Sequence, residues 1–363
     1  MEKEFRIGGE FDLTWEHYLS KPTSQEPLPY INNDHYLFVD TGRSALLLAL
    51  LRIRSLGGKA EAWLPVYCCE SVILPFRQLG FELHFYSTGE DLQSPSYLPE
   101  KLDGQTFLFI NYFGIKNEGI INWLNDINGR DSCFIIEDNV QAGFSNNVGN
   151  TGDFVIYSYR KVLPQPDGAV LAYRGEPASF VLEEPCEEFI SSKVMGKLIR
   201  AANGDAHSFL PLLNEAESII DDRIIPRQMS AFSRYLFNRT NFKGIKEKRR
   251  ENWLYIKDLM EQECGKIGSF SQLFDNLSED EVPLGFPIQI HRNRDELRNY
   301  LITQNVFCPI HWPIADERLE LEVGKADNKL SSMLLTIPID QRVSKRDIEY
   351  CVDRLAQFLR RSI

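Results

Sequence analysis

The sequence contains no hydrophobic run long enough to cross a membrane. Its longest apolar stretch, residues 45–51, is far shorter than the roughly 20 residues that a membrane-spanning helix needs. The first residues are charged and lack the apolar core of a signal peptide. We therefore expect a cytoplasmic protein without a membrane partner.

Cysteine spacing of the kind that binds zinc is also missing. The seven cysteines are scattered, and no two form a C-x-x-C pair, which argues against a zinc ribbon and against a disulfide framework. The six histidines show no metal-ligand spacing either. We expect reduced thiols and no bound metal.

Positive charge is in the minority. Lys and Arg number 40 against 52 Asp and Glu, which gives a net charge of −12. Such a balance disfavours nucleic acid as the main partner, although a local basic pocket for a phosphorylated ligand stays possible. Hydrophobic and charged fractions of 43% and 25% are those of an ordinary globular protein, and 363 residues suggest two domains.

Short β-rich apolar runs alternate with helical patterns along the first half of the chain. We expect strands at 36–39, 62–65, 82–86, 106–113, 133–136, 154–157 and 169–173. Strands that alternate with helices indicate an α/β fold with a mostly parallel central sheet between helices. Helical spacing then covers 187–203, 208–220 and one long helix, 229–263, before a smaller C-terminal α/β domain. We divide the chain into an N-terminal arm (1–35), a large domain (36–228) and a linking helix with the small domain (229–363).

Two predicted strands end in side chains that could take part in catalysis. One ends in Glu137-Asp138, and the next runs into Ser158 and Lys161. Open α/β sheets bind ligands at the carboxyl ends of their strands. A carboxylate and an amine placed there suit pyridoxal phosphate (PLP), because the amine can bind the cofactor covalently and the carboxylate can keep its ring nitrogen protonated. On spacing alone, an ordinary turn with a solvated lysine is the better interpretation.

A turn after the first predicted strand has the features of an anion site. Thr41-Gly42-Arg43-Ser44 stands between that strand and a buried helix, so backbone N–H groups of the helix start would face the sheet edge. Such groups bind phosphate. Simple capping of the helix by Thr41 or Ser44 is the alternative.

Together these motifs resemble the DegT/DnrJ/EryC1/StrS family of sugar aminotransferases. The resemblance covers roughly residues 8–360, and the segment Glu137-Asp138-Asn139-Val140-Gln141-Ala142 with Lys161 is its most specific part. The other matching segments are 8–11, 41–46, 152–153, 158–161 and 305–313, the last of which contains His311-Trp312.

The resemblance implies a PLP-dependent transferase of fold type I, with PLP as cofactor. Lys161 would bind PLP covalently and act as the general base, and Asp138 would pair with the ring nitrogen. The remaining roles fall on Gln141 beside the ring hydroxyl, on Gly42, Arg43, Ser44 and Ser158 at the phosphate, on Tyr67 stacked on the ring, and on His311 and Trp312 at the substrate.

Several positions depart from the family pattern. The interval from Ser158 to Lys161 is two residues shorter than usual, and the turn 166–169 lacks a double glycine. Cys69 is an alternative to Tyr67 at the stacking position. Arg227 stands in a segment that has lost the family's asparagine; it could bind a substrate anion, or form a surface salt bridge.

By resemblance, the activity would be transfer of an amino group from glutamate or a similar donor to a keto group of a nucleotide-linked sugar, in glycan biosynthesis. A homodimer is expected on the same ground. Two alternatives stay open: another PLP reaction, such as a lyase or a non-sugar aminotransferase, and a PLP-fold partner protein without catalysis.

Overall fold

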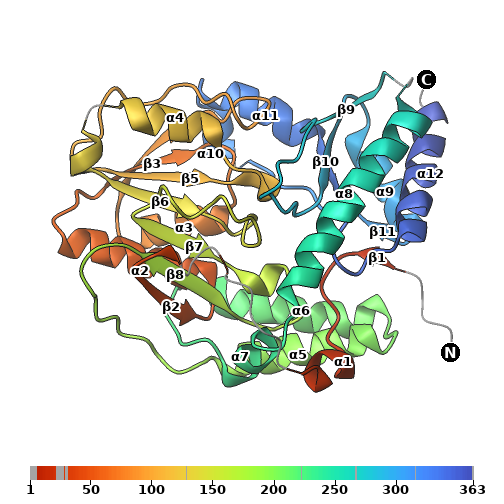
Figure 1. Cartoon of the computed structure of the whole chain (residues 1–363), viewed down its shortest axis with the longest axis horizontal. Helices are drawn as coiled ribbons and strands as arrows, with labels where there is room; N and C mark the ends of the chain where they lie inside the picture. Colours follow the sequence, from red (N-terminus) through yellow and green to blue (C-terminus); the bar gives the residue numbers. More distant parts are fainter. Residues whose placement is uncertain are drawn as a thin grey trace.

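A seven-stranded sheet forms the centre of the molecule (Figure 1). The computed structural model describes residues 6–21, 28, 32–127, 129–221, 223–265, 268–314 and 316–361. In spatial order the strands are β2 (His35–Val39), β8 (Ala169–Tyr173), β7 (Phe154–Tyr157), β6 (Phe134–Asp138), β5 (Thr106–Ile110), β3 (Glu61–Pro65) and β4 (Glu82–Tyr86).

Most neighbouring strands in this sheet run parallel. The antiparallel exception is β8, which is antiparallel to both β2 and β7, while the pairs from β7 to β4 are parallel. The predicted mostly parallel sheet is confirmed. Because β2 points the same way as β7, its carboxyl end lies at the same edge as the carboxyl ends of β3, β5, β6 and β7.

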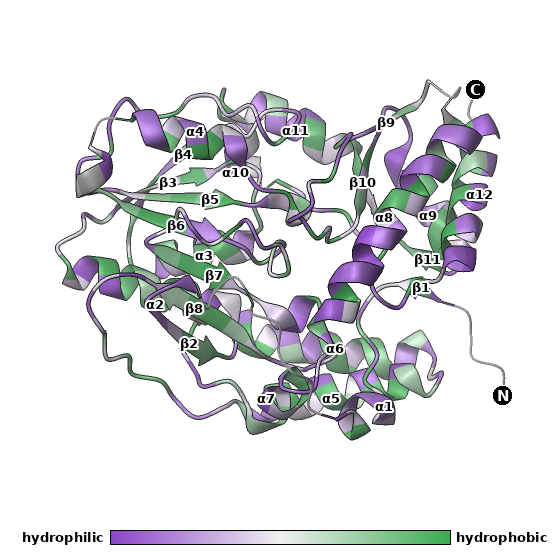
Figure 2. Cartoon of the chain, in the orientation of Figure 1, coloured by the Kyte–Doolittle hydropathy of each residue, from purple (hydrophilic) through white to green (hydrophobic). Residues whose placement is uncertain are grey.

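Helices cover both faces of the sheet, because side chains of a strand alternate between its faces. Leu108 and Ile136 pack on one face with residues of helices α2 (Gly42–Ser55) and α3 (Glu70–Gln78). Phe109 and Ile135 pack on the other face with α4 (Glu118–Asp126). The inner strands β5, β7 and β8 are fully buried and almost wholly hydrophobic (Figure 2), as strands covered on both faces should be.

A smaller α/β unit follows in the C-terminal part of the chain. Its antiparallel sheet has the order β12 (Leu334–Ile337), β10 (Phe286–Ile290) and β9 (Phe270–Gln272). Three helices share a separate hydrophobic core with this sheet: α8 (Phe242–Cys264), α9 (Arg294–Thr303) and α12 (Lys345–Arg361). The predicted smaller α/β unit is thus confirmed, whereas the residue limits of the domains stay a prediction.

The N-terminal segment joins this smaller unit. Strand β1 (Ile7–Gly8) pairs in parallel with β11 (Val306–Phe307), and Ile7 is buried in the core of the C-terminal helices. The short helix α1 (Trp15–Leu19) follows. Residues 1–5, 22–27 and 29–31 of the predicted arm lie outside the described residues.

The prediction of one helix over 229–263 is wrong, because the chain forms α7 (Ala231–Phe237) and then α8. Ser230 and Asn241 cap the two helices, each with a side chain that accepts an N–H of the first turn. The other helices are α5 (Glu187–Ala201), α6 (Ala206–Asp221), α10 (Asp316–Leu319) and α11 (Gly324–Met333). None of the described helices is long and apolar enough to cross a membrane.

Candidate active site

A cavity of about 540 Å³ opens at the edge where the carboxyl ends of the central strands meet. Loops after β2, β3, β6 and β7 contribute to its wall, and the loop after β11 closes it from the smaller unit. Eight of the predicted site residues line it: Gly42, Arg43, Asp138, Gln141, Ser158, Lys161, His311 and Trp312.

Asp138 and Lys161 face the same cavity from neighbouring strands. Asp138 is the last residue of β6, and burial raises its pKa to about 6. The N–H of Val140, which donates to Oδ1 at 2.9 Å, and the charge of Lys161 both act to lower this pKa. Lys161 projects into the cavity. Loss of water around its amine lowers its pKa, and Arg160 adds to this, whereas Cys69 and Asp138 oppose it. A lysine with a lowered pKa is a better nucleophile and base near neutral pH.

A 3₁₀ turn accommodates the short interval between Ser158 and Lys161. Residues Tyr159–Lys161 form this turn, and the N–H of Lys161 donates to the carbonyl of Ser158 at 3.4 Å. The N–H of Arg160 donates to the carbonyl of Gly168 at 3.1 Å. The tight turn delivers Lys161 to the cavity although the interval is short.

The N-terminus of α2 forms one end of the cavity. Thr41 caps the helix, because its side chain accepts the N–H of Ser44 at 3.2 Å. Ser44 therefore belongs to the cap and is not part of the cavity wall, whereas Gly42 lines the cavity. The first N–H groups of a helix have no intrahelical partner and attract anions.

Ser158 completes this end of the cavity. Its side chain is 3% exposed, and within the described part of the chain its Oγ has no hydrogen-bond partner. A Cβ added at Gly42 would meet the Cβ of Ser158 at 3.6 Å, so the hydroxyl lies next to the helix start. A buried hydroxyl without a protein partner is free to bind a ligand or a water molecule.

A network of ion pairs surrounds the same end. Glu217 of α6 accepts two hydrogen bonds from Arg160, at 2.8 and 3.2 Å, and pairs with Lys193 at 2.6 Å and Arg43 at 3.5 Å. These cations hold the pKa of Glu217 well below its usual range despite burial. The network extends through Asp221, Lys197 and Glu10. Asp40 acts on Arg160 as well, so four cations are set against four carboxylates at this end of the cavity.

Gln141 and His311 occupy the other walls. The backbone N–H of Phe113 donates to Oε1 of Gln141 at 2.7 Å, which fixes the amide. The Nδ1 of His311 lies 3.1 Å from Oγ1 of Thr336. Desolvation, with a smaller effect of Lys161, lowers the pKa of His311 to about 4, so the imidazole is neutral at pH 7.

Two predicted residues lie away from the cavity. Tyr67 is fully buried, with its ring 5.6 Å from that of Trp312, and Cys69 lines the cavity in its place. Tyr67 belongs to the hydrophobic cluster against which Trp312 packs. Arg227 is held outside the cavity by pairing with Glu183 at 3.5 Å.

Several cavity residues were not predicted from the sequence as site residues: Glu10, Arg160, Glu217 and Asp221. Arg160 directly precedes Lys161, and this position could have identified it as a site residue. Glu10 lies in the matching segment 8–11, whereas Glu217 and Asp221 lie in a distant helix that no local pattern marks.

Asp167 in the unusual turn before β8 has a structural role. Its carboxylate accepts the N–H of Ser230 at 2.8 Å, the Oγ of the same serine at 2.6 Å, and the Oγ of Ser233. It therefore ties the turn to the first residues of α7.

The chain shares its fold with solved aminotransferases. The PMP form of Spr1654 from Streptococcus pneumoniae is 12% identical, with a TM-score of 0.68 and 98% of each chain covered. A DegT DnrJ EryC1 StrS aminotransferase from Brucella abortus is 16% identical (TM-score 0.58; 91% of this chain and 87% of that chain). The sugar aminotransferase CalS13 from Micromonospora echinospora is 14% identical (TM-score 0.58; 90% and 88%).

This likeness confirms the fold class, including the large and small α/β units. No family model matches the chain, and neither does any curated protein. At such low identity the shared structure speaks for the fold, and the chemistry has to be argued from the residues of the cavity.

The donors of the cavity fit PLP. At one end the start of α2 and the unpartnered hydroxyl of Ser158 suit a phosphate. At the other, Asp138 suits a protonated ring nitrogen, because a nearby cation would offset its burial. Lys161 stands in the same cavity with an amine of lowered pKa.

Proposed function

We propose that this chain is a PLP-dependent aminotransferase. The observation that carries the proposal is one cavity that contains the carboxylate of Asp138, the amine of Lys161 and the unpartnered hydroxyl of Ser158 at a helix start. The shared fold with aminotransferases, among them a PMP-bound form, supports it. We infer membership of the DegT/DnrJ/EryC1/StrS family from the same fold and from the motifs.

Each residue would have a defined task. Ser158 and the N–H groups of Gly42 and Arg43 would bind the phosphate, and ionised Asp138 would accept a hydrogen bond from the ring nitrogen. When bound, PLP supplies an electron sink for the electrons left by loss of a substrate proton. Lys161 would hold the cofactor and then, once released, take and return that proton at Nζ.

The remaining residues would shape the pocket. Gln141 would lie beside the ring and Cys69 against one of its faces. His311 and Trp312 would contact the substrate from the side of the small unit. A neutral imidazole at pH 7 can donate or accept a hydrogen bond without adding a second positive charge next to Lys161.

For the substrates, we propose glutamate or a similar amino donor and a keto group on a nucleotide-linked sugar. Structural neighbours such as CalS13 are sugar aminotransferases, which supports a sugar acceptor. We further propose a homodimer in the cytoplasm; seven free cysteines fit a reducing compartment. Light scattering of the purified protein would give the oligomeric state.

The test is the amino-transfer half-reaction. The purified protein is loaded with PLP, mixed with L-glutamate or other amino acids, and followed by absorbance. We expect the cofactor to be converted to its amine form, and nucleotide-linked keto sugars then to regenerate PLP with formation of an amino sugar detected by mass spectrometry. If no donor converts the cofactor, a lyase reaction is favoured instead.

A further inference from the structure

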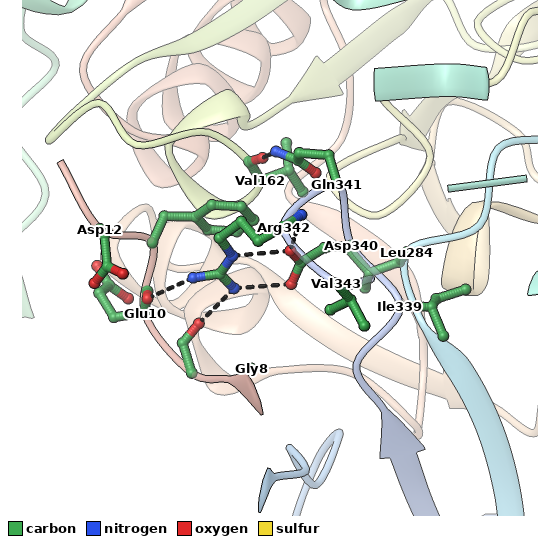
Figure 3. Close-up of polar contacts among 12 residues, drawn as sticks. Gly8, Glu10, Asp12, Val162, Leu284, Ile339, Asp340, Gln341, Arg342 and Val343 are labelled. Atoms are coloured by element: carbon green, nitrogen blue, oxygen red, sulfur yellow. Dashed lines mark hydrogen bonds and ion pairs between the residues drawn. The ribbon is translucent and has the colours of Figure 1, made fainter. Parts of the chain in front are cut away.

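Both neighbours of Lys161 in the chain are anchored by distant parts of the molecule. On one side, Nε2 of Gln341 donates to the carbonyl of Val162 at 3.0 Å, and Figure 3 shows this contact from the smaller unit. On the other side, the guanidinium of Arg160 donates to the carboxylate of Glu217 in α6 at 2.8 and 3.2 Å. The backbone of the turn is held less firmly, because the nitrogen of Lys161 lies 3.4 Å from its acceptor. The place of the reacting amine therefore depends on these two anchors.

The anchor at Arg160 consists of one carboxylate. Within the described part of the chain, the side chain of Arg160 forms no hydrogen bond besides the two to Glu217, and its Nε has no partner. This side chain is 11% exposed, so little water is available to replace the two bonds. Loss of the carboxylate would leave a buried guanidinium without an acceptor and would release the turn that carries Lys161.

The same carboxylate reaches the start of α2. Its Oε2, which accepts one of the hydrogen bonds from Arg160, lies 3.5 Å from Nη2 of Arg43, the second residue of that helix. Asp221, one turn further along α6, also accepts a hydrogen bond from Arg43. Residues four positions apart lie on one face of a helix. One face of α6 is therefore fastened both to the start of α2 and to the lysine turn.

These contacts join the two places that PLP would have to reach at once. In the proposed function, the start of α2 binds the phosphate and Lys161 binds the aldehyde carbon. Both groups are attached to neighbouring atoms of one rigid ring, so the distance between them varies little. Binding groups of this kind have to be held within about 0.5 Å of their productive positions. A shift of α2 relative to the lysine turn would therefore weaken the binding of PLP.

We propose that Glu217 is a positioning residue that sets the spacing between the phosphate-binding start of α2 and Lys161. The inference rests on the proposed function, because it concerns the two ends of that cofactor site. None of the sequence segments that match the family lies in α6, so these motifs do not assign the task. Glu217 acts through Arg43 and Arg160 and needs no contact with the cofactor.

Three ligands separate spacing from binding at either end. PLP reaches both ends, pyridoxal lacks the phosphate, and inorganic phosphate lacks the ring. Their affinities are measured on the cofactor-free protein, for PLP and pyridoxal from the absorbance of the bound form and for phosphate from its competition with PLP. The test variant is Glu217→Asp, which keeps the charge but shortens the side chain by one methylene group.

The spacing role predicts a selective loss of PLP binding. We expect Glu217→Asp to bind PLP at least about fivefold more weakly, and to bind pyridoxal and phosphate within about twofold of the unchanged protein. Glu215→Asp, at an exposed position of the same helix, is the control and should change none of the three affinities. Unchanged PLP affinity in Glu217→Asp overturns the proposal. So does an equal loss for PLP and one of the smaller ligands, because Glu217 would then support only one end of the site.

Hydrogen exchange of the cofactor-free protein tests the anchor without any ligand. Glu217→Gln removes the charge that Arg160 and Lys193 share. We expect the amides of residues 159–163 to accelerate at least about threefold more than those of α12, which lies in the separate core of the smaller unit. Equal acceleration in both regions would mean that only the overall stability has fallen, which contradicts the proposal. If Glu217→Gln does not fold, Glu217→Asp takes its place.

The positioning role and the proposed function can fail separately. If amino acids convert the bound cofactor to its amine form while Glu217→Asp keeps the PLP affinity of the unchanged protein, the positioning role fails and the proposed function stands. If PLP binding depends on Glu217 as predicted but no amino acid converts the cofactor, the aminotransferase proposal fails and the positioning role stands. If the unchanged protein binds no PLP, both fail.

Discussion

In the protein without cofactor, the ionised carboxylate of Asp138 destabilises the folded state, because it is buried. Burial raises its pKa from the ordinary value of 3.8 to about 6. An acid whose pKa is raised by folding binds more protons in the folded state, so the folded protein loses stability as pH rises from about 3.8 to 6. The loss reflects a site built for a cationic partner.

Replacement of Asp138 by asparagine should therefore stabilise the cofactor-free protein above pH 6. We expect a gain on the order of 2 kcal/mol at pH 8 relative to the gain at pH 4, from the size of the pKa shift. Urea denaturation at both pH values measures it. Asp258→Asn, at an exposed position of α8, is the control and should show no such pH dependence; an equal effect of Asp138→Asn at both pH values would contradict the assignment.

At the level of elements, α6 contributes to the cavity through Glu217. Its carboxylate joins the cations of α2, α5 and the lysine turn, so its loss leaves buried Lys193 and Arg160 without their main partner. Removal of one partner of a buried ion pair is destabilising, and partial exposure of Glu217 reduces the effect.

Glu217→Gln should lower the free energy of unfolding by about 1–3 kcal/mol at pH 7. Because folding lowers the pKa of Glu217, this contribution is complete above the unfolded pKa of 4.5 and declines as pH falls below it. Urea denaturation at pH 7 and pH 3.5 compares the two conditions. Glu215→Gln, exposed on the same helix, should be neutral, and a difference that persists undiminished at pH 3.5 would argue against the ion-pair account.

A second element-scale prediction concerns the turn before β8. Asp167→Asn replaces one acceptor oxygen by an NH2 group that faces N–H and O–H donors of Ser230 and Ser233. Buried donors without acceptors cost about 1–3 kcal/mol, so thermal and urea unfolding should show a loss of this size. A variant as stable as the unchanged protein would show that the turn and α7 are not coupled through this carboxylate.

The elements themselves were largely predictable. Apolar runs bounded by polar residues located the strands of the central sheet, and burial on both faces gives the inner strands a nearly continuous hydrophobic signal. The strand predicted at 106–113 ends at Ile110, because the apolar run continues into a 3₁₀ turn. A single helix was wrongly predicted over 229–263, because charged residues and helical spacing continue across the caps at Ser230 and Asn241. The two-residue strands β1 and β11 carry too little pattern to be seen without their partner.

At the scale of the whole molecule, the site is assembled from three distant parts of the chain. Strand ends of the large unit supply Asp138 and Lys161, and the motifs at those ends were visible in the sequence. The smaller unit supplies His311, and α6 supplies Glu217. Sequence resemblance pointed to His311, whereas the place of Glu217 depends on tertiary packing that no local spacing encodes.

The most direct test of the central claim is to identify the residue that binds PLP. The protein is incubated with PLP, reduced with borohydride, digested, and analysed by mass spectrometry. We predict the cofactor mass on Lys161, and no retained cofactor in Lys161→Ala. A modified lysine elsewhere, or cofactor retained equally by Lys161→Ala, would contradict the account.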